Sequence, residues 1–183
     1  MNPPASVEGG ERLRLFCALR LPEQVLDTLV EWGGAHLRER VVSRPNLHVT
    51  LAFLGHRPSD ELDAIVGATR EAAAAAGPIR LEPVRYRETR SVGMLVLADE
   101  GGAAAGLAED LHGRLQELGV YEREQRPWLP HLTVVRFRQR PRLDPPLPEL
   151  EPFSPSDAAV YLSRLRRSGA QYEVVESFVL GGG

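Results

Sequence analysis

Two tetrapeptides in this chain share one pattern: histidine, apolar residue, threonine, apolar residue. The first is His-Val-Thr-Leu at residues 48–51, and the second is His-Leu-Thr-Val at residues 131–134. In a β-strand, residues i and i+2 lie on the same face, so each copy would present an imidazole beside a hydroxyl. Two such strands facing one another would form a pocket with two proton-transfer groups and two hydrogen-bond donors. Those groups are sufficient to cleave a phosphodiester without a metal ion.

The repetition exceeds what chance placement gives. The chain of 183 residues has five histidines and five threonines. A threonine would follow two positions after a histidine roughly 0.14 times by chance, before any apolar requirement. The flanks agree as well, because Arg44 and Pro45 precede the first copy, and Arg126 and Pro127 precede the second. This similarity predicts two related halves that meet at one shared site.

The four polar residues of the motifs suit the hydrolysis of a 2′,3′-cyclic phosphate. Water must be activated on one side of phosphorus, and the leaving sugar oxygen must be protonated on the other. Histidine titrates near pH 6.5, so His48 and His131 could fill both roles, each contributing ~10²–10⁴-fold in rate. Thr50 and Thr133 could donate hydrogen bonds to the non-bridging oxygens. The residues alone do not decide which histidine is the base.

The sequence allows two other interpretations of the histidines. Either could be a core histidine with its hydrogen bonds satisfied, although the matched pair argues against this. A metal site would need three or four ligands, but the sequence shows no cysteine cluster, and threonine is a poor ligand. We therefore expect neither a metal nor a cofactor. His36 and His112 on predicted helices, and His56 in a predicted turn, are expected at the surface.

Composition limits the class of protein further. The length fits one domain, and 43% hydrophobic content provides a sizeable core. No apolar run approaches the ~20 residues of a membrane span, and the polar N-terminus has no apolar signal segment, so we expect a cytoplasmic protein with no membrane partner. Cys17 lies in an apolar run and is expected to be a core residue rather than a nucleophile.

All 22 basic residues are arginines, which excludes chemistry that needs a lysine, such as a P-loop, a Schiff base or a His-x-Lys phosphodiesterase. The net charge of −3 argues against binding along long nucleic acid. Ten arginines nevertheless fall in three short segments, at residues 85–90, 136–142 and 164–167. They are either solvated charges or, in part, the lining of a cleft for a small anion or an RNA end.

The elements that would position the motifs follow from hydrophobic periodicity. Helices are expected at residues 22–40, from 59 to 76, and from 107 to 118. Strands are expected at residues 13–19, 47–55, 79–87, 91–98, 129–138, 158–164 and 172–180. In the first motif strand, alternation places Val49, Leu51 and Phe53 on one face and His48, Thr50 and Ala52 on the other. This order predicts an α+β domain with antiparallel sheets and two lobes over residues 12–183, after a flexible tail at 1–11.

Taken together, the residues resemble a known family, the two-histidine (2H) phosphoesterase superfamily. The context is similar to its RNA 2′,3′-cyclic phosphodiesterases, also called 2′-5′ RNA ligases of the LigT type. The similarity extends over roughly residues 12 to 180. The matching segments are Arg-Leu-Phe-Cys-Ala-Leu at 14–19, Pro-Asn-Leu-His-Val-Thr-Leu-Ala-Phe-Leu-Gly at 45–55, residues 126–136, Tyr-Leu-Ser-Arg at 161–164 and Gly-Ala-Gln-Tyr at 169–172.

The resemblance implies a two-lobed, pseudo-two-fold α+β fold whose antiparallel sheets surround a central cleft. It implies metal-independent hydrolysis of 2′,3′-cyclic phosphates to 2′-phosphomonoesters, with His48 and His131 as the acid/base pair and Thr50 and Thr133 on the phosphate. Phe16 would either wall the base-binding side or belong to the core, and Arg136 could contact phosphate. The segment at residues 88–92 is shorter than in relatives.

The expected partner is an RNA with a 2′,3′-cyclic phosphate end or a small cyclic nucleotide, bound by a monomer. Three other functions stay open at the level of sequence. One is the joining of RNA halves through a 2′-5′ linkage at the same site. Another is action on a different 2H substrate, such as a cyclic nucleotide or a 2′-5′ oligonucleotide. The third is a non-catalytic RNA-end binding module, for which two proton-transfer groups would not be needed.

Overall fold

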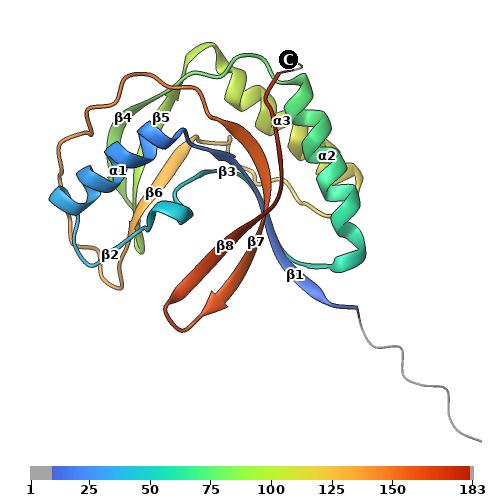
Figure 1. Ribbon diagram of the computed structural model, residues 1–183, viewed down its shortest axis with the longest axis horizontal. Coiled ribbons are helices and arrows are strands. Elements are labelled where there is room, and N and C mark those ends of the chain that lie inside the picture. The colour runs from blue at the N-terminus through green and yellow to red at the C-terminus, as the bar shows by residue number, and fades with distance from the viewer. Residues whose placement is uncertain (1–9, 182–183) are drawn as a thin grey trace, which may run out of the picture.

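The computed structural model describes residues 10–181, whose strands form a curled antiparallel sheet with helices packed on it (Figure 1). The strands are β1 (Arg12–Arg20), β2 (Arg40–Val41), β3 (Val49–Pro58), β4 (Leu81–Glu88), β5 (Val92–Asp99), β6 (His131–Arg136), β7 (Asp157–Arg166) and β8 (Gly169–Phe178). The helices are α1 (Glu23–His36), α2 (Leu62–Ala75) and α3 (Ala103–Glu117), with short 3-10 turns η1 (Arg44–Asn46), η2 (Ser59–Glu61) and η3 (Glu100–Gly102). The predicted α+β class and antiparallel pairing are confirmed. Of the predicted tail, residues 1–9 lie outside the described part of the chain.

The sheet has two halves that meet at its centre. Its strand order is β4-β5-β6-β3-β1-β7-β8, with β2 beside β6. Between β3 and β6 the ladder has one residue pair, Val49 with Leu132. One half therefore consists of β6 flanked by β5 and β4, and the other of β3 flanked by β1, β7 and β8. The two motif strands, β3 and β6, are therefore neighbours at the centre of the whole sheet, where its two halves meet.

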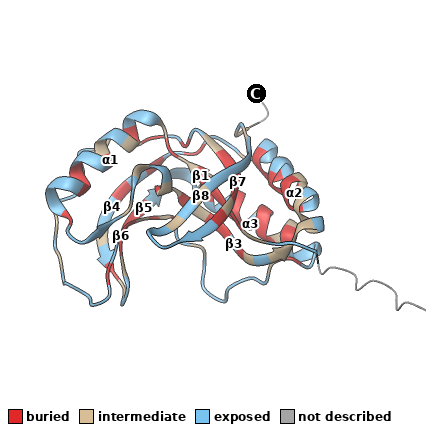
Figure 2. Cartoon of the chain, turned by 60° about the horizontal axis from the view of Figure 1, so that its bottom comes forward, coloured by how far each residue is buried: buried red, intermediate tan, exposed pale blue. Residues whose placement is uncertain are grey.

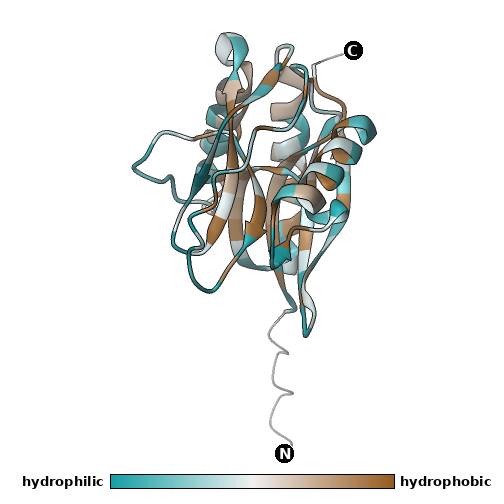
Figure 3. Ribbon diagram, turned by 90° about the vertical axis from the view of Figure 1, so that its left-hand side faces the viewer, coloured by the Kyte–Doolittle hydropathy of each residue, from teal (hydrophilic) through white to brown (hydrophobic). Residues whose placement is uncertain are grey.

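The main core fills the space between the helices and one face of the sheet. Val49 and Leu132 are fully buried there with residues of all three helices. Burial of each such side chain contributes about 1.5–3 kcal/mol, which fixes the face that each motif strand turns away from the core. Figure 2 shows buried residues along the strands and on the helix sides facing the sheet, and Figure 3 shows the matching concentration of hydrophobic residues.

Helix α1 begins after Pro22 and continues through both glycines before ending at His36. Its side chains at positions 25, 29 and 32 are buried, as the helical spacing predicts. Gly33 lies close to β2, because a Cβ at this position would be 3.2 Å from a methyl group of Val41. Gly33 therefore permits close packing, and the helix continues through both glycines without a break.

A β-bulge corrects the predicted alternation of β3. On β1, Ala18 pairs with Thr50 and the preceding Cys17 pairs with Ala52, so Leu51 is an extra residue. The insertion shifts the face of every residue that follows. Ala52 is consequently buried, whereas Phe53 is 50% exposed on the face that carries Thr50. The prediction that Phe53 belongs to the buried face is wrong for this reason.

Candidate active site

The two motifs lie against each other on the open face of the sheet. His48 immediately precedes β3, and His131 is the first residue of β6. Because Val49 pairs with Leu132, the same register places His48 opposite Thr133 and Thr50 opposite His131. Directly opposite residues share a face of an antiparallel pair, and the diagonal positions of the two histidines are about 7–8 Å apart. The register thus places all four predicted polar residues on one face of two neighbouring strands.

The two imidazoles are held in the same way. The Nδ1 atom of His48 lies 2.7 Å from the carbonyl oxygen of Asn46, and that of His131 lies 2.8 Å from the carbonyl oxygen of Leu129. A carbonyl oxygen only accepts, so in both rings the hydrogen-bond network assigns the proton to Nδ1. Each Nε2 is then left for chemistry. In the first motif the Thr50 hydroxyl lies 2.9 Å from Nε2 of His48.

The ring of His48 is enclosed by aromatic side chains. Phe16 on β1 lies 4.9 Å from it between ring centroids, Tyr172 on β8 lies 5.5 Å away with an edge-on orientation, and Tyr161 on β7 lies 5.9 Å away. Phe16 and Tyr161 stack on each other at 4.8 Å and are buried. These aromatic rings form most of a small second core on the open face of the sheet.

This environment keeps His48 neutral. Burial, which disfavours the charged imidazolium, lowers the pKa of His48 to about 4. The hydrogen bond to the carbonyl of Asn46 opposes the shift, whereas the positive charges of Arg136 and His131 add to it. At neutral pH the Nε2 atom of His48 is therefore unprotonated, and it can accept a proton once the Thr50 hydroxyl releases it.

The surroundings of His131 are different. On β5, Val96 pairs with His131 and Met94 pairs with Thr133. The next strand, β4, places exposed arginines beside these two apolar residues. Arg136 is exposed near the end of β6. The site is thus lined by aromatic rings on the His48 side and by cations beyond an apolar strip on the His131 side.

Three polar contacts that sequence reasoning missed hold the motif ends in place. The indole Nε1 of Trp128 donates to the carbonyl oxygen of Thr50 at 3.0 Å, which ties the loop before β6 to β3. The side-chain amide of Asn46 donates to the carbonyl oxygen of Ala170 at 2.9 Å, at the start of β8. The backbone N–H of Leu97 donates to the carbonyl oxygen of Pro130 at 3.0 Å. Trp128 and Asn46 lie in the segments that precede the two motifs and resemble the known family. That resemblance is the sequence feature that could have pointed to them.

Two other residues were proposed to contact the substrate. Phe16 is only 3% exposed and packs against His48, so its observed contacts are those of a core residue that encloses the imidazole. Arg136 lies near enough to influence the charge of His48, at the edge of the site. Their contact with substrate stays a prediction.

The remaining histidines and the cysteine are outside this arrangement. His36 and His56 are exposed, as predicted, although His56 lies in β3 and not in a turn. His112 is buried, which corrects the surface assignment: its Nε2 lies 2.7 Å from the carbonyl oxygen of Leu51, and its ring contacts Tyr121. Cys17 is fully buried, and burial raises the pKa of its thiol to about 11, so the predicted core role is confirmed.

Within residues 10–181, no three histidine, cysteine, aspartate or glutamate side chains gather as a group that could hold a metal ion. None of the helices in this part of the chain is both long enough and apolar enough to cross a membrane. The chemical groups that the site does offer are two imidazoles and two hydroxyls on one face of the sheet, which are the groups that both proton transfers of a displacement at phosphorus require.

Comparison with known proteins gives a consistent result. The family model of the 2′-5′ RNA ligase superfamily matches residues 19–168. A curated relative from Thermus thermophilus, named RNA 2′,3′-cyclic phosphodiesterase, is 31% identical over 93% of this chain and 91% of its own length. An Escherichia coli protein of the same name is 24% identical over 93% of this chain and 98% of its own length.

Solved structures have the same fold. The crystal structure of a Thermus thermophilus protein superposes with a TM-score of 0.78 at 30% identity, covering 92% of this chain and 98% of that one. Escherichia coli LigT complexed with 3′-AMP gives a TM-score of 0.78 at 23% identity, covering 93% of this chain and 99% of that one.

Proposed function

Because the chain belongs to the 2′-5′ RNA ligase superfamily, we propose that it is an RNA 2′,3′-cyclic phosphodiesterase. Its substrate is an RNA end carrying a 2′,3′-cyclic phosphate, and its product is a 2′-phosphomonoester with a free 3′-hydroxyl. The observation that carries the proposal is the pairing of the two His-x-Thr motifs on one face, through Val49 and Leu132. Simple binding of an RNA end would not need two positioned imidazoles.

The mechanism uses the histidines on opposite sides of phosphorus. His48 is neutral, so its Nε2 takes a proton from the attacking water as the new P–O bond forms. His131, protonated at Nε2 before attack, gives that proton to the 3′-oxygen as the P–O3′ bond breaks. After this step His48 has gained one proton and His131 has lost one. Loss of a proton from His48 to water and uptake of one by His131 restore the starting state.

The threonines hold the charge that develops on the phosphate. Thr50 and Thr133 lie opposite the partner histidines in the register, so each hydroxyl can donate to a non-bridging oxygen. Thr50 donates to Nε2 of His48 in the free site, and turning toward the phosphate would release that nitrogen to act as base. These steps need no metal or cofactor, since the imidazoles move both protons and the ring strain of the substrate favours opening.

The test is incubation of the full chain with an RNA oligonucleotide that ends in a 2′,3′-cyclic phosphate, with and without EDTA. We expect complete conversion to the 2′-phosphate isomer, identified by chromatography against 2′- and 3′-phosphate standards, at equal rates in both conditions. A 3′-phosphate product would contradict the assigned leaving group. Loss of activity with EDTA would favour a metal-dependent reaction instead.

The family description favours one further reaction at the same site. A 5′-hydroxyl RNA end could take the place of water and attack the same phosphorus, and loss of the 3′-oxygen would then leave the two RNAs joined through a 2′-5′ linkage. By microscopic reversibility, the same site would also cleave that linkage. Adding an RNA with a 5′-hydroxyl to the assay would detect this as a longer product that resists nucleases specific for 3′-5′ linkages.

A further inference from the structure

Strand β4 presents two arginines to the same face of the sheet as the catalytic motifs. On β5, Val96 pairs with His131 on one side and with Arg85 on the other. Met94 pairs in the same way with Thr133 and with Arg87. Paired residues in an antiparallel sheet share a face. His131 and Thr133 are therefore each in line, across one residue of β5, with an arginine of β4 on the same face.

The space between the arginines and the motif is short and apolar. Neighbouring strands lie about 4.8 Å apart, so the arginine backbones are about 10 Å from those of His131 and Thr133. Met94 and Val96 fill that space and are 8% and 5% exposed. A nucleic acid strand with one phosphate per 3.4 Å of rise or more crosses this distance within about three nucleotides. The arginines are therefore within reach of the nucleotides next to the reacting end.

Both arginines are free to bind a ligand. Arg85 and Arg87 are exposed, and neither forms an ion pair or a side-chain hydrogen bond with any residue in 10–181. Other members of the arginine-rich segments are engaged, since Arg140 pairs with Glu88 and Arg164 pairs with Glu173. The exposed acidic residue on this face of β4, Glu82, lies on the far side of the bulge at Val84 and marks the end of the cationic surface.

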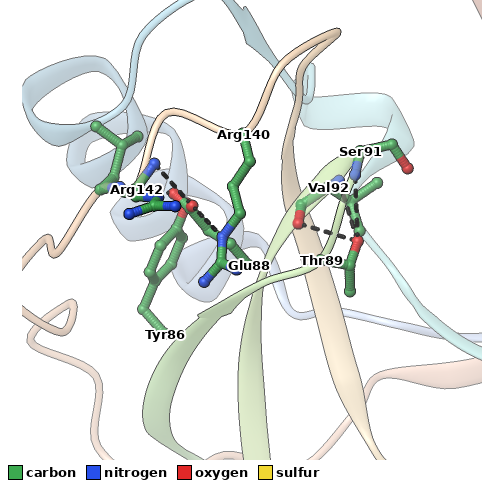
Figure 4. A network of polar contacts seen from close by, with 8 residues as sticks. Tyr86, Glu88, Thr89, Ser91, Val92, Arg140 and Arg142 are labelled. Carbon is green, nitrogen blue, oxygen red and sulfur yellow. Dashed lines mark hydrogen bonds and ion pairs between the residues drawn. The ribbon is translucent and has the colours of Figure 1, made fainter.

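The opposite face of β4 is fixed by a separate network, shown in Figure 4. The buried carboxylate of Glu88 accepts hydrogen bonds from the Tyr86 hydroxyl at 3.0 Å and from the backbone N–H groups of Arg142 at 2.9 Å and Leu143 at 2.8 Å. Tyr86 and Glu88 alternate with the two free arginines along the strand. This network anchors the edge strand β4 to the loop that follows β6, and so fixes the strand that carries Arg85 and Arg87.

We propose that Arg85 and Arg87 bind the backbone phosphates of the RNA strand that leads to the cyclic phosphate end. This inference rests on the proposed function, and it specifies the substrate as an oligonucleotide rather than a mononucleotide. The apolar strip formed by Met94 and Val96 lies under the sugar and base of the intervening nucleotide. Neutralising these arginines removes attraction for the strand and leaves the reacting groups in place.

The experiment compares two substrates in one double variant, Arg85→Gln/Arg87→Gln. The substrates are 2′,3′-cyclic AMP and a ten-nucleotide RNA ending in a 2′,3′-cyclic phosphate. We expect the ratio of kcat/KM for the oligonucleotide to that for the mononucleotide to fall about tenfold, because two exposed charge contacts are lost. The salt dependence of oligonucleotide turnover should weaken by about 1.4 in the slope of log kcat/KM against log salt concentration.

A control removes two ion-paired arginines from the helices, the exposed Arg70 and the half-buried Arg114, as Arg70→Gln/Arg114→Gln, and should leave that ratio unchanged. An equal fall for both substrates, or no fall for either, would overturn the role of the β4 arginines. If the wild-type chain turns over neither substrate, the proposed function fails on its own. RNA binding by Arg85 and Arg87 is then tested by fluorescence anisotropy with the same RNA bearing a 2′-phosphate. Its affinity must drop in the β4 variant and not in the control.

Discussion

The two halves of the sheet carry the same tetrapeptide in different surroundings. On the β3 side, the strand next to the motif contributes Phe16, and the strands beyond it add Tyr161 and Tyr172. On the β6 side, the equivalent neighbours are the apolar strip of β5 and the free arginines of β4. Both histidines share the Nδ1 hydrogen bond to the carbonyl two residues earlier.

This difference shows how a repeated motif can give two distinct roles. The carbonyl group two residues before each histidine fixes its tautomer, and this contact is the same in both copies. The flanking strands set the solvation and the local charge, and they differ. The aromatic side lowers the pKa of His48, which suits it to accept a proton. The arginine side is open and cationic, which suits it to receive an anionic strand.

The largest expected effect tests what the halves have in common. His48→Ala and His131→Ala should each lower kcat on the cyclic phosphate by about 10²–10⁴-fold, because each removes one proton-transfer group. Single-turnover assays would measure the loss, with circular dichroism to verify folding. His56→Ala, at an exposed histidine farther along β3, is the matched control and should keep full activity. Near-normal turnover in either motif variant would contradict the claim that both histidines act in one catalytic site.

The next effect tests the aromatic side through stability. In the unfolded chain a histidine titrates near pH 6.5, whereas in the folded protein the pKa of His48 is about 4. Below pH 6.5 the unfolded chain binds a proton that the folded chain does not. The stability contributed by neutral His48 is therefore fully present above pH 6.5 and is lost as the pH falls toward 4, by about 3 kcal/mol in total.

Urea unfolding at pH 7 and pH 4 would measure this loss in the wild-type chain and in His48→Asn. The variant should lose about 3 kcal/mol less between the two pH values, since its side chain does not titrate. Carboxylate groups titrate equally in both proteins and cancel in the difference. Identical losses would show that the aromatic enclosure does not keep His48 neutral.

The smallest effect tests the coupling between the halves. Arg136 belongs to the β6 half but lowers the pKa of His48 in the β3 half. Arg136→Gln should raise that pKa by a fraction of the total shift, because burial is the larger cause. Histidine NMR titration would detect the change. Arg138→Gln, at an exposed arginine two residues further, should leave the titration unchanged; an equal rise there would mean that only net charge matters.

Much of the fold followed from patterns of spacing. The predicted strand at residues 13–19 is observed as β1 (Arg12–Arg20), and the predicted helix from 59 to 76 includes α2 (Leu62–Ala75). The strands expected at residues 158–164 and 172–180 correspond to β7 and β8, which pair as a hairpin. These elements are set by local periodicity, glycine and proline, which a sequence shows directly.

Other features depended on how the strands pair. The extra residue at Leu51 is visible only against β1, and it turned Phe53 outward. His112 was expected at the surface of its helix. It is instead buried against β3, where the carbonyl oxygen of Leu51 accepts its hydrogen bond. The arginine-rich segments were equivalent as sequence. Only strand register separates Arg85 and Arg87, which face the site, from arginines that are paired elsewhere.

The sequence by itself determined the reacting groups: two histidines and two threonines at strand spacing, with no lysine to support other phosphate chemistry. Tertiary structure alone decided what distinguishes the two copies. The register of Val49 with Leu132 brings the motifs together, and the flanking strands give one imidazole a buried aromatic setting and the other an open cationic one. Local composition fixes which atoms can react, whereas proton affinity depends on burial and nearby charge, which come from residues distant in the chain.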